Sequence, residues 1–312
     1  MMLLKLIPAD THVNFLKARY VAYALSAILI AASMALFFTR GLNLGIDFKG
    51  GITIEVGAEQ PIDIAAMRAV VNGQDVGDAS IQAFGSANEA LIRIARQPGE
   101  AEAQQAAVDR VKSALDDRFD NLEWRRTEVV GPKISEELFR DGIMAMSLAV
   151  IAVLVYIWFR FEWQFGLGAV IALVHDVLLT IGFFSLTGLE FNLSIVAAIL
   201  TIIGYSLNDT VVVYDRIRET IRRFRKMEMV ELLNLSLNQT LSRTLMTSLT
   251  TLLALFALFF FGGAVIQGFT AAMIWGVFVG TYSSIFVAAP VLLMLKVKRE
   301  NLLPDEAKSS AP

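Results

Sequence analysis

The chain contains six long apolar stretches, each close to the roughly 20 residues that an α-helix needs to cross a bilayer. No charged residue occurs between Thr244 and Leu295, which is too long a stretch for one span, and the glycines around Gly262 supply a turn within it. We therefore predict a multi-pass α-helical membrane protein. The predicted spans are residues 20–38, 140–159, 164–187, 192–214, 240–261 and 268–295.

The composition agrees with this class of protein. Of the 312 residues, 55% are hydrophobic and 18% are charged, whereas soluble domains carry about 25% charged residues. The absence of cysteine excludes disulfides, thiol nucleophiles and cysteine-ligated zinc. The two histidines, His12 and His175, are too few for a histidine-rich metal site. We expect neither a metal nor another cofactor.

The first apolar stretch follows Lys17 and Arg19, as the apolar core of a signal peptide follows basic residues. It is longer than the roughly 7 to 15 residues typical of such a core. No clear cleavage site follows it before Arg40. We interpret it as an uncleaved first span.

The distribution of lysine and arginine predicts the orientation, because short cytosolic loops are enriched in these residues. The connections 188–191 and 262–267 contain none, whereas Arg160 and the cluster from Arg216 to Lys226 lie at the opposite ends of the spans. Both termini are therefore expected in the cytosol. The expected cytosolic parts are an N-terminal segment (1–19), a basic loop (215–239) whose residues 222–234 form a helix lying against the membrane, and a C-terminal tail (296–312).

The segment between the first two spans is expected to be extracytoplasmic and folded. It comprises an α+β domain and its junctions, residues 39–139, which we call the sheet domain. Apolar and polar residues alternate at 52–56, as in a half-buried strand, and apolar residues three or four apart at 100–119 predict a helix. The order β-α-β-β-α-β indicates a ferredoxin-like fold. The other predicted elements are a helix at 61–71 and strands at 80–84, 90–95 and 124–130.

The fourth predicted span contains an Asn-Asp pair, Asn208-Asp209. An ionisable side chain at membrane depth is costly and by default marks an ion or substrate pathway. Arg243, about one turn inside the fifth predicted span, is its natural partner, and an arginine can tune a proton site but cannot release a proton itself. We interpret these residues as a proton pathway with Asp209 as the carrier. A static ion pair, or an Arg243 that reaches the lipid headgroups, are the structural alternatives.

Two further groups of residues are candidates for a functional role. His175-Asp176 forms a polar pair in the third predicted span, either a proton relay or a hydrogen-bonded packing pair. We rank Asp176 below Asp209, because neighbouring residues of a helix point about 100° apart. The junction of the first span with the sheet domain contains four residues typical of a hinge or a tightly packed turn: Gly45, Asp47, Gly50 and Gly51.

Four segments together resemble the SecD/SecF family, membrane subunits of the bacterial Sec protein-export system that are related to the RND transporters. The resemblance covers essentially the whole chain, in the family's order. The Ser-Leu-Asn-Asp form of the span-four motif and the short sheet domain favour the family's smaller subunit over SecD or a fused SecD-SecF chain. The segments are Gly45-Ile-Asp-Phe-Lys-Gly-Gly51, Gly131-Pro-Lys-Ile-Ser-Glu-Glu137, the motif that runs from Ile203 to Glu219, and Ser242-Arg-Thr-Leu-Met-Thr-Ser248.

The resemblance implies a function. Such a subunit is an auxiliary component of the Sec translocase and not an enzyme, and with SecD it uses the proton-motive force to promote export of preproteins. Asp209 matches the family's proton-pathway aspartate, and Arg243 matches the arginine that faces it. SecD is expected to supply the other six-helix half and a further aspartate.

The resemblance also implies a location and partners. The protein is expected in the bacterial inner membrane, with both termini in the cytosol and the sheet domain in the periplasm. Nucleic acid is not expected as a partner. The implied partners are SecD, the SecY-E-G channel, the motor SecA, YajC as a further candidate, and the translocating preproteins.

Two rival classes of protein are weaker on the same residues. A proton-coupled RND-type exporter of small molecules or lipids would use Asp209 in the same way, but the sheet domain looks too small to enclose an apolar tunnel. An enzyme lacks support, because the nucleophile motif G-x-S-x-G, the zinc motif H-E-x-x-H and the P-loop are all absent.

Overall fold

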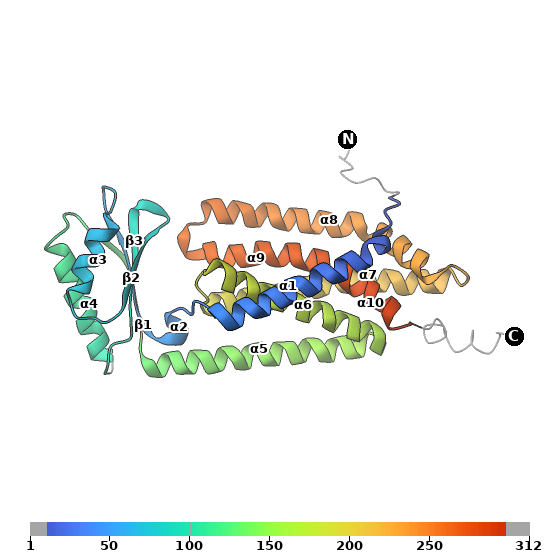
Figure 1. Cartoon of the computed structure of the whole chain (residues 1–312), viewed down its shortest axis with the longest axis horizontal. Helices are drawn as coiled ribbons and strands as arrows, with labels where there is room; N and C mark the ends of the chain where they lie inside the picture. Colours follow the sequence, from blue (N-terminus) through green and yellow to red (C-terminus); the bar gives the residue numbers. More distant parts are fainter. Residues whose placement is uncertain (1–10, 100, 298–312) are drawn as a thin grey trace.

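The computed structural model describes residues 11–99 and 101–297, which form a long helical bundle with the sheet domain at one end (Figure 1). Within these residues, six helices are long and apolar enough to cross a membrane, which confirms the predicted fold class. The expected terminal segments 1–19 and 296–312 lie partly outside the described residues. The spanning helices are α1 (Arg19–Arg40), α5 (Pro132–Arg160), α6 (Trp163–Thr187), α7 (Leu193–Arg223), α8 (Met229–Phe261) and α9 (Ala264–Ser283), the last continued by the π-helical η2 (Ser284–Ala288) and by α10 (Ala289–Met294).

The sheet domain has the predicted β-α-β-β-α-β order. Its four strands pair in the order β2-β3-β1-β4, and every neighbouring pair is antiparallel. This places β1 inside the sheet between β3 and β4, as the ferredoxin-like arrangement requires. The elements are β1 (Gly51–Gly57), α3 (Ile64–Asn72), β2 (Ala79–Phe84), β3 (Ser86–Ile94), α4 (Ala101–Asp116) and β4 (Glu123–Val130).

The two faces of the sheet have different neighbours. Helices α3 and α4 cover the face turned away from the bundle (Figure 1), where Ile52, Ile54 and Val56 of β1 are buried. The alternate residues Thr53 and Glu55 point to the opposite face, since successive side chains of a strand alternate. The bundle therefore faces the polar side of the sheet.

The predicted basic loop 215–239 and its surface helix are wrong. Helix α7 continues to Arg223 and α8 begins at Met229, so only residues 224–228 connect them. The reason is packing at the end of the bundle. Leu232, Leu233 and Leu237 of α8 are buried in one apolar cluster with η1 (Phe15–Ala18), η2 and α10, and this burial continues the helix beyond the predicted span.

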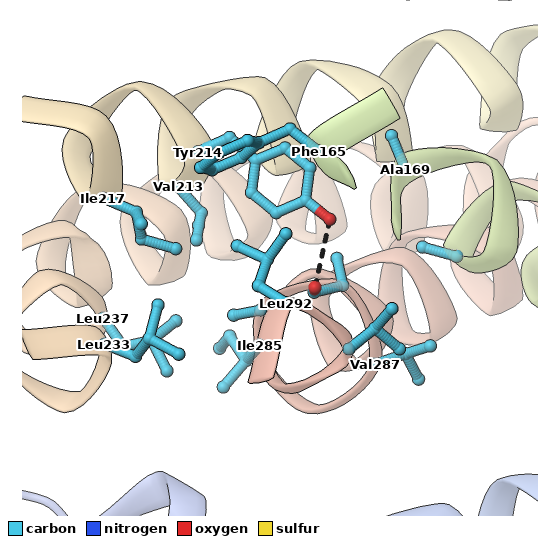
Figure 2. Packing of buried hydrophobic residues seen from close by; sticks show 14 of the residues in the cluster. Phe165, Ala169, Val213, Tyr214, Ile217, Leu233, Leu237, Ile285, Val287 and Leu292 are labelled. Carbon is cyan, nitrogen blue, oxygen red and sulfur yellow. Dashed lines mark hydrogen bonds between the residues drawn. The ribbon is translucent and has the colours of Figure 1, made fainter. Parts of the chain in front are cut away.

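The far end of the bundle packs around Tyr214 of α7, which is fully buried (Figure 2). Its hydroxyl donates a hydrogen bond of 3.0 Å to the carbonyl of Ala288 at the end of η2. Pro290 follows two residues later, and a proline inside a helix lacks the N–H that an α-helical ladder needs. The π-helical turn therefore lies where the proline interrupts the α-helical hydrogen bonds.

Helices α1 and α6 lie close together at Gly182. A Cβ placed there would lie 2.9 Å from the Cα of Ser33, so any side chain must push the backbone of α1 away. We expect Gly182→Ala to destabilise the protein by about 1–3 kcal/mol, as overpacking does. The measurement is the thermal unfolding midpoint in detergent. Gly204→Ala is the matched control, because a Cβ at Gly204 meets no atom within 4 Å; equal midpoints for the two variants would contradict the expectation.

Candidate functional site

A layer of buried polar side chains crosses the middle of the bundle, and we call it the polar layer. It separates an apolar cluster near the sheet domain, around Phe184 and Ile199, from the cluster around Phe165 and Tyr214 at the far end. Its members come from α6, α7, α8 and the junction of α9 with η2. They are His175, Asp176, Ser206, Asp209, Thr244, Ser248, Ser283 and Ser284.

Asp209 lies near the middle of α7, about 24 Å from the start of the helix at 1.5 Å per residue. The residue is 8% exposed. Thr244 Oγ1 donates to Asp209 Oδ1 at 2.8 Å, and Ser284 Oγ donates to Oδ2 at 2.6 Å. Each carboxylate oxygen therefore has a hydroxyl partner. Because a hydroxyl can both donate and accept, the same two partners can serve the charged and the protonated carboxyl.

The other two residues of the predicted proton pathway lie on the outer surface of the bundle. Arg243 is exposed on α8, directly before Thr244, and Asn208 is exposed on α7, directly before Asp209. Arg243 is adjacent in sequence to Thr244, whose hydroxyl binds Asp209. No ion pair between them occurs in the described part of the chain. The structure thus places the carboxylate inside the bundle and its cationic neighbour outside it.

His175 and Asp176 of α6 are almost fully buried, at 2% and 1% exposure. His175 Nδ1 lies 2.8 Å from Asp176 Oδ1. The two side chains leave the helix about 100° apart, but the imidazole is long enough to reach the adjacent carboxylate, so the pair is hydrogen-bonded. Asp176 Oδ2 also accepts hydrogen bonds from Ser283 and Ser206.

Sequence reasoning missed Ser283 and Ser284. These neighbours stand where α9 changes into the π-helical η2, and they bind Asp176 and Asp209 respectively. Single π-helical turns inside α-helices occur frequently at functional sites. The available signal was a pair of serines a few residues before Pro290 in an otherwise apolar span.

The junction residue Asp47 contacts the start of the helix that carries Asp209. Its Oδ2 accepts a 2.8 Å hydrogen bond from the backbone N–H of Leu193, the first residue of α7. Around it, Gly45 N–H donates to Phe191 O, and Phe191 N–H donates to Asn43 O, both within 3 Å. Four N–H groups at a helix start lack partners within the helix, so a carboxylate there satisfies one and interacts well with the helix dipole.

Gly50 and Gly51 form the turn from the short helix α2 (Ile46–Lys49) into β1. Their φ angles are +72° and +134°, a region that L side chains rarely adopt. A Cβ at Gly51 would in addition lie 2.7 Å from the carbonyl oxygen of Ile94. Glycine is therefore required here by backbone geometry and by space.

A polar cleft of about 330 Å³ lies between the open face of the sheet and the adjacent ends of the bundle helices. An ion pair joins its two sides: Arg93 of β3 binds Glu190 of the α6–α7 connection. Burial raises the pKa of the Glu190 carboxyl, the charge of Arg93 lowers it, and the nearby carboxylates Asp47 and Glu128 raise it again. The ion pair is thus a further link, besides the contacts of Asp47, between the sheet domain and the start of α7.

In the part of the chain that the structure describes, no group of three or more His, Cys, Asp or Glu side chains could hold a metal ion. The chemistry of the site rests on two buried carboxyls, one imidazole and the surrounding hydroxyls. These groups can hold and pass protons.

The chain is similar to known proteins along most of its length. Residues 110–298 match the family described as protein export membrane protein SecD/SecF, C-terminal, and residues 35–62, which contain the Asp47 junction, match the SecD/SecF GG motif. Protein translocase subunit SecF of Cereibacter sphaeroides is 46% identical over 302 residues, covering 95% of this chain and 93% of the relative. The subunit of Rickettsia prowazekii is 45% identical over 299 residues, covering 96% of both chains.

Two solved structures are also similar. The crystal structure of SecDF, a translocon-associated membrane protein from a Thermus species, aligns with a TM-score of 0.83 and 38% identity over 93% of this chain. SecDF in its super-membrane-facing form aligns with a TM-score of 0.68 and 39% identity over 96% of this chain. The chain spans nearly the full length of the two SecF relatives but only 40% of each solved chain.

The Arg93–Glu190 pair predicts a pH-dependent stability. In Arg93→Met the lowering effect of the guanidinium is lost, so the pKa of Glu190 lies further above its unfolded value of about 4.3. The ionised carboxyl then opposes folding, and this penalty grows as the pH rises from the unfolded pKa through the folded one. We expect the variant's deficit in unfolding temperature to be larger at pH 8 than at about pH 4.5.

The measurement is the unfolding midpoint in detergent at both pH values, compared with the wild type. Adding Glu190→Gln to the Arg93→Met variant removes the titrating group and should remove the pH dependence of the deficit. A deficit of the same size at both pH values would show that the pair does not act through the charge of Glu190.

Proposed function

Because the chain belongs to the SecD/SecF family of protein-export membrane proteins, we propose that it is an auxiliary subunit of the Sec translocase. Together with SecD it uses the proton-motive force to promote export of preproteins across the bacterial inner membrane. The observation that carries the proposal is Asp209, a carboxylate held by two hydroxyls at the middle of a spanning helix. An ionisable group at that depth is costly and is kept for function.

Asp209 is the proton carrier in this proposal, and Arg243 is the group that biases it. A guanidinium stays protonated and so cannot pass the proton on. Its exposed position beside Thr244 means that a small rotation of α8 would change its distance from the carboxylate. Approach favours the charged carboxylate and thus proton release, and withdrawal favours proton uptake.

SecD is the proposed partner at the surface formed by α7 and α8. An exposed arginine at membrane depth is unfavourable against lipid, and Asn208 beside it is polar as well. The same side of α7 exposes the small residues Ala197, Thr201 and Gly204, which allow another helix to approach closely. A second six-helix half would cover this surface, in keeping with solved SecDF chains of which this chain matches only 40%.

The start of α7 is proposed to transmit the proton state of Asp209 to the sheet domain. A helix is stiff along its axis, so a shift at Asp209 moves the helix start as well. There, Asp47 and the ion pair of Glu190 with Arg93 connect α7 to β1 and β3. We infer that the sheet domain moves with the proton cycle and acts on the emerging preprotein.

The proposed orientation places the sheet domain in the periplasm and both termini in the cytosol. Arg160, Arg216 and Arg218 gather at the end of the bundle opposite to the sheet domain, which agrees with the enrichment of basic residues in cytosolic loops. The SecY-E-G channel and SecA are the further proposed partners, with YajC as an additional candidate.

The proposal predicts the effect of Asp209→Asn. The amide keeps the size and the hydrogen bonds to Thr244 and Ser284 but cannot hold a proton, so the complex should assemble with SecD and lose proton-dependent export. Export and proton uptake are measured in vesicles that contain SecD and the channel. Glu219→Gln, an exposed carboxyl on the same helix, is the control. Full proton-dependent export by the Asp209 variant would falsify the proposal.

The connection through Asp47 predicts a different pattern. Asp47→Ala removes the acceptor at the start of α7, a loss of about 1 kcal/mol for a helix cap, and should reduce export severalfold while proton uptake continues. Asp47→Asn keeps an oxygen acceptor for the Leu193 N–H and should retain most of the export. The same vesicle assay measures both quantities. If Asp47→Ala exports like the wild type, this contact does not transmit the motion.

A further inference from the structure

Asp176 is a second buried carboxyl that the proposed pathway does not use. Its two oxygens have three side-chain partners: His175 on Oδ1, and Ser206 and Ser283 on Oδ2. An apolar residue of similar size would fill the same space in the bundle without the desolvation penalty of a buried carboxylate. Helix packing alone therefore gives no reason for an aspartate with three polar partners at this position. The group is held in place at 1% exposure, between α6, α7 and α9.

His175 is the only ion-pairing partner of Asp176 within the described residues. The imidazole stacks on the ring of Tyr282, with ring centroids 5.9 Å apart. Its second nitrogen, Nε2, is buried and has no hydrogen-bond partner in the described part of the chain. Leaving such an atom unpaired carries a desolvation cost. A role in helix packing gives no reason to bury Nε2 of His175 without a partner. A role in accepting and releasing a proton does, because the imidazole is then needed for its titrating nitrogens.

The two carboxyls are held by adjacent residues. Ser283 donates to Asp176, and Ser284 donates to Asp209 at the first turn of η2. Ser206, which also donates to Asp176, lies one helical turn before Asp209 on α7. A change at either carboxyl therefore acts on the same turn of η2 and the same turn of α7 that position the other.

Among the described residues, few other charged or titratable groups face Asp176 from the elements packed around it. From α6 there is His175, from α7 there is Asp209 beyond Ser206, and from α9 there is Tyr282, whose hydroxyl is engaged by Ser26 and the Ala22 carbonyl of α1. The exposed Arg243 is adjacent in sequence to Thr244, which binds Asp209. Two carboxylates charged at once in this buried layer would oppose each other, and the imidazole of His175 is the nearest group that could balance Asp176.

We propose that Asp176 and His175 form a second proton-holding site of this chain, coupled to Asp209 through the π-helical turn at Ser283 and Ser284. The inference rests on the proposed proton-driven function and extends it. A proton bound at the pair is shared between Asp176 Oδ1 and His175 Nδ1, and its arrival neutralises the carboxylate while Asp209 releases its own proton. The total charge of the polar layer is then conserved through the step.

The test is infrared difference spectroscopy of the complex of this chain with SecD, titrated with pH, together with export in vesicles. In the wild type, carboxyl bands from both aspartates should change with pH. Asp176→Asn keeps acceptor and donor atoms for the serines and should remove one band, shift the titration of the other, and lower proton-driven export about tenfold or more. Thr180→Val is the control, because within the described residues this buried hydroxyl binds only the Asp176 backbone carbonyl.

A second variant keeps the inference falsifiable if Asp176→Asn does not assemble. His175→Gln can still donate to Asp176 but cannot take a proton, and it should shift the pH profile of export without lowering the unfolding temperature. Unchanged bands and an unchanged pH profile in both variants would overturn the inference and leave the pair structural. The spectra also separate the two proposals: if Asp209→Asn exports normally, the main pathway fails, but a titrating Asp176 band still supports a proton site at the pair.

Discussion

Burying a carboxylate among apolar helices costs several kcal/mol unless hydrogen bonds replace its water, and the interior of this bundle is organised around two such groups. Asp209 and Asp176 each receive hydroxyl donors from neighbouring helices, and Ser283 and Ser284 supply one donor to each. The polar layer therefore ties four helices together at one depth. Apolar clusters lie on either side of this layer, around Phe184 and Ile199 and around Phe165 and Tyr214.

Helix α7 links the polar layer to the sheet domain. Because α7 is a single 31-residue helix, its start at Leu193 and the carboxylate at Asp209 belong to one stiff element. The junction closes on that start through Asp47, and the glycine turn at Gly50 and Gly51 leads directly into the central strand β1. In the proposed mechanism, α7 transmits a movement in the polar layer to the sheet through these contacts and through the Arg93–Glu190 ion pair.

Local sequence patterns predict the architecture correctly, but they do not predict where all of the helices begin and end. The six spans and the β-α-β-β-α-β order follow from hydrophobic length and from periods of 2 and 3.6 residues. The prediction of a loop at 215–239 was wrong because a basic stretch is typical of an exposed surface segment. Its leucines are nevertheless buried against the other end of the chain, near Phe15 and Leu16, and no local pattern records that contact.

The class of the protein, the position of Asp209 within a spanning helix and the glycines of the junction all follow from the amino-acid sequence, because hydrophobicity, charge at membrane depth and backbone freedom are properties of single positions and short windows. The groups that surround those residues depend instead on how the helices pack. Thr244, Ser284 and the Leu193 N–H come to their carboxylate partners from 35, 75 and 146 positions away along the chain. The helix packing that joins them also leaves Asn208 and Arg243 outside, since neighbouring residues of a helix point in different directions.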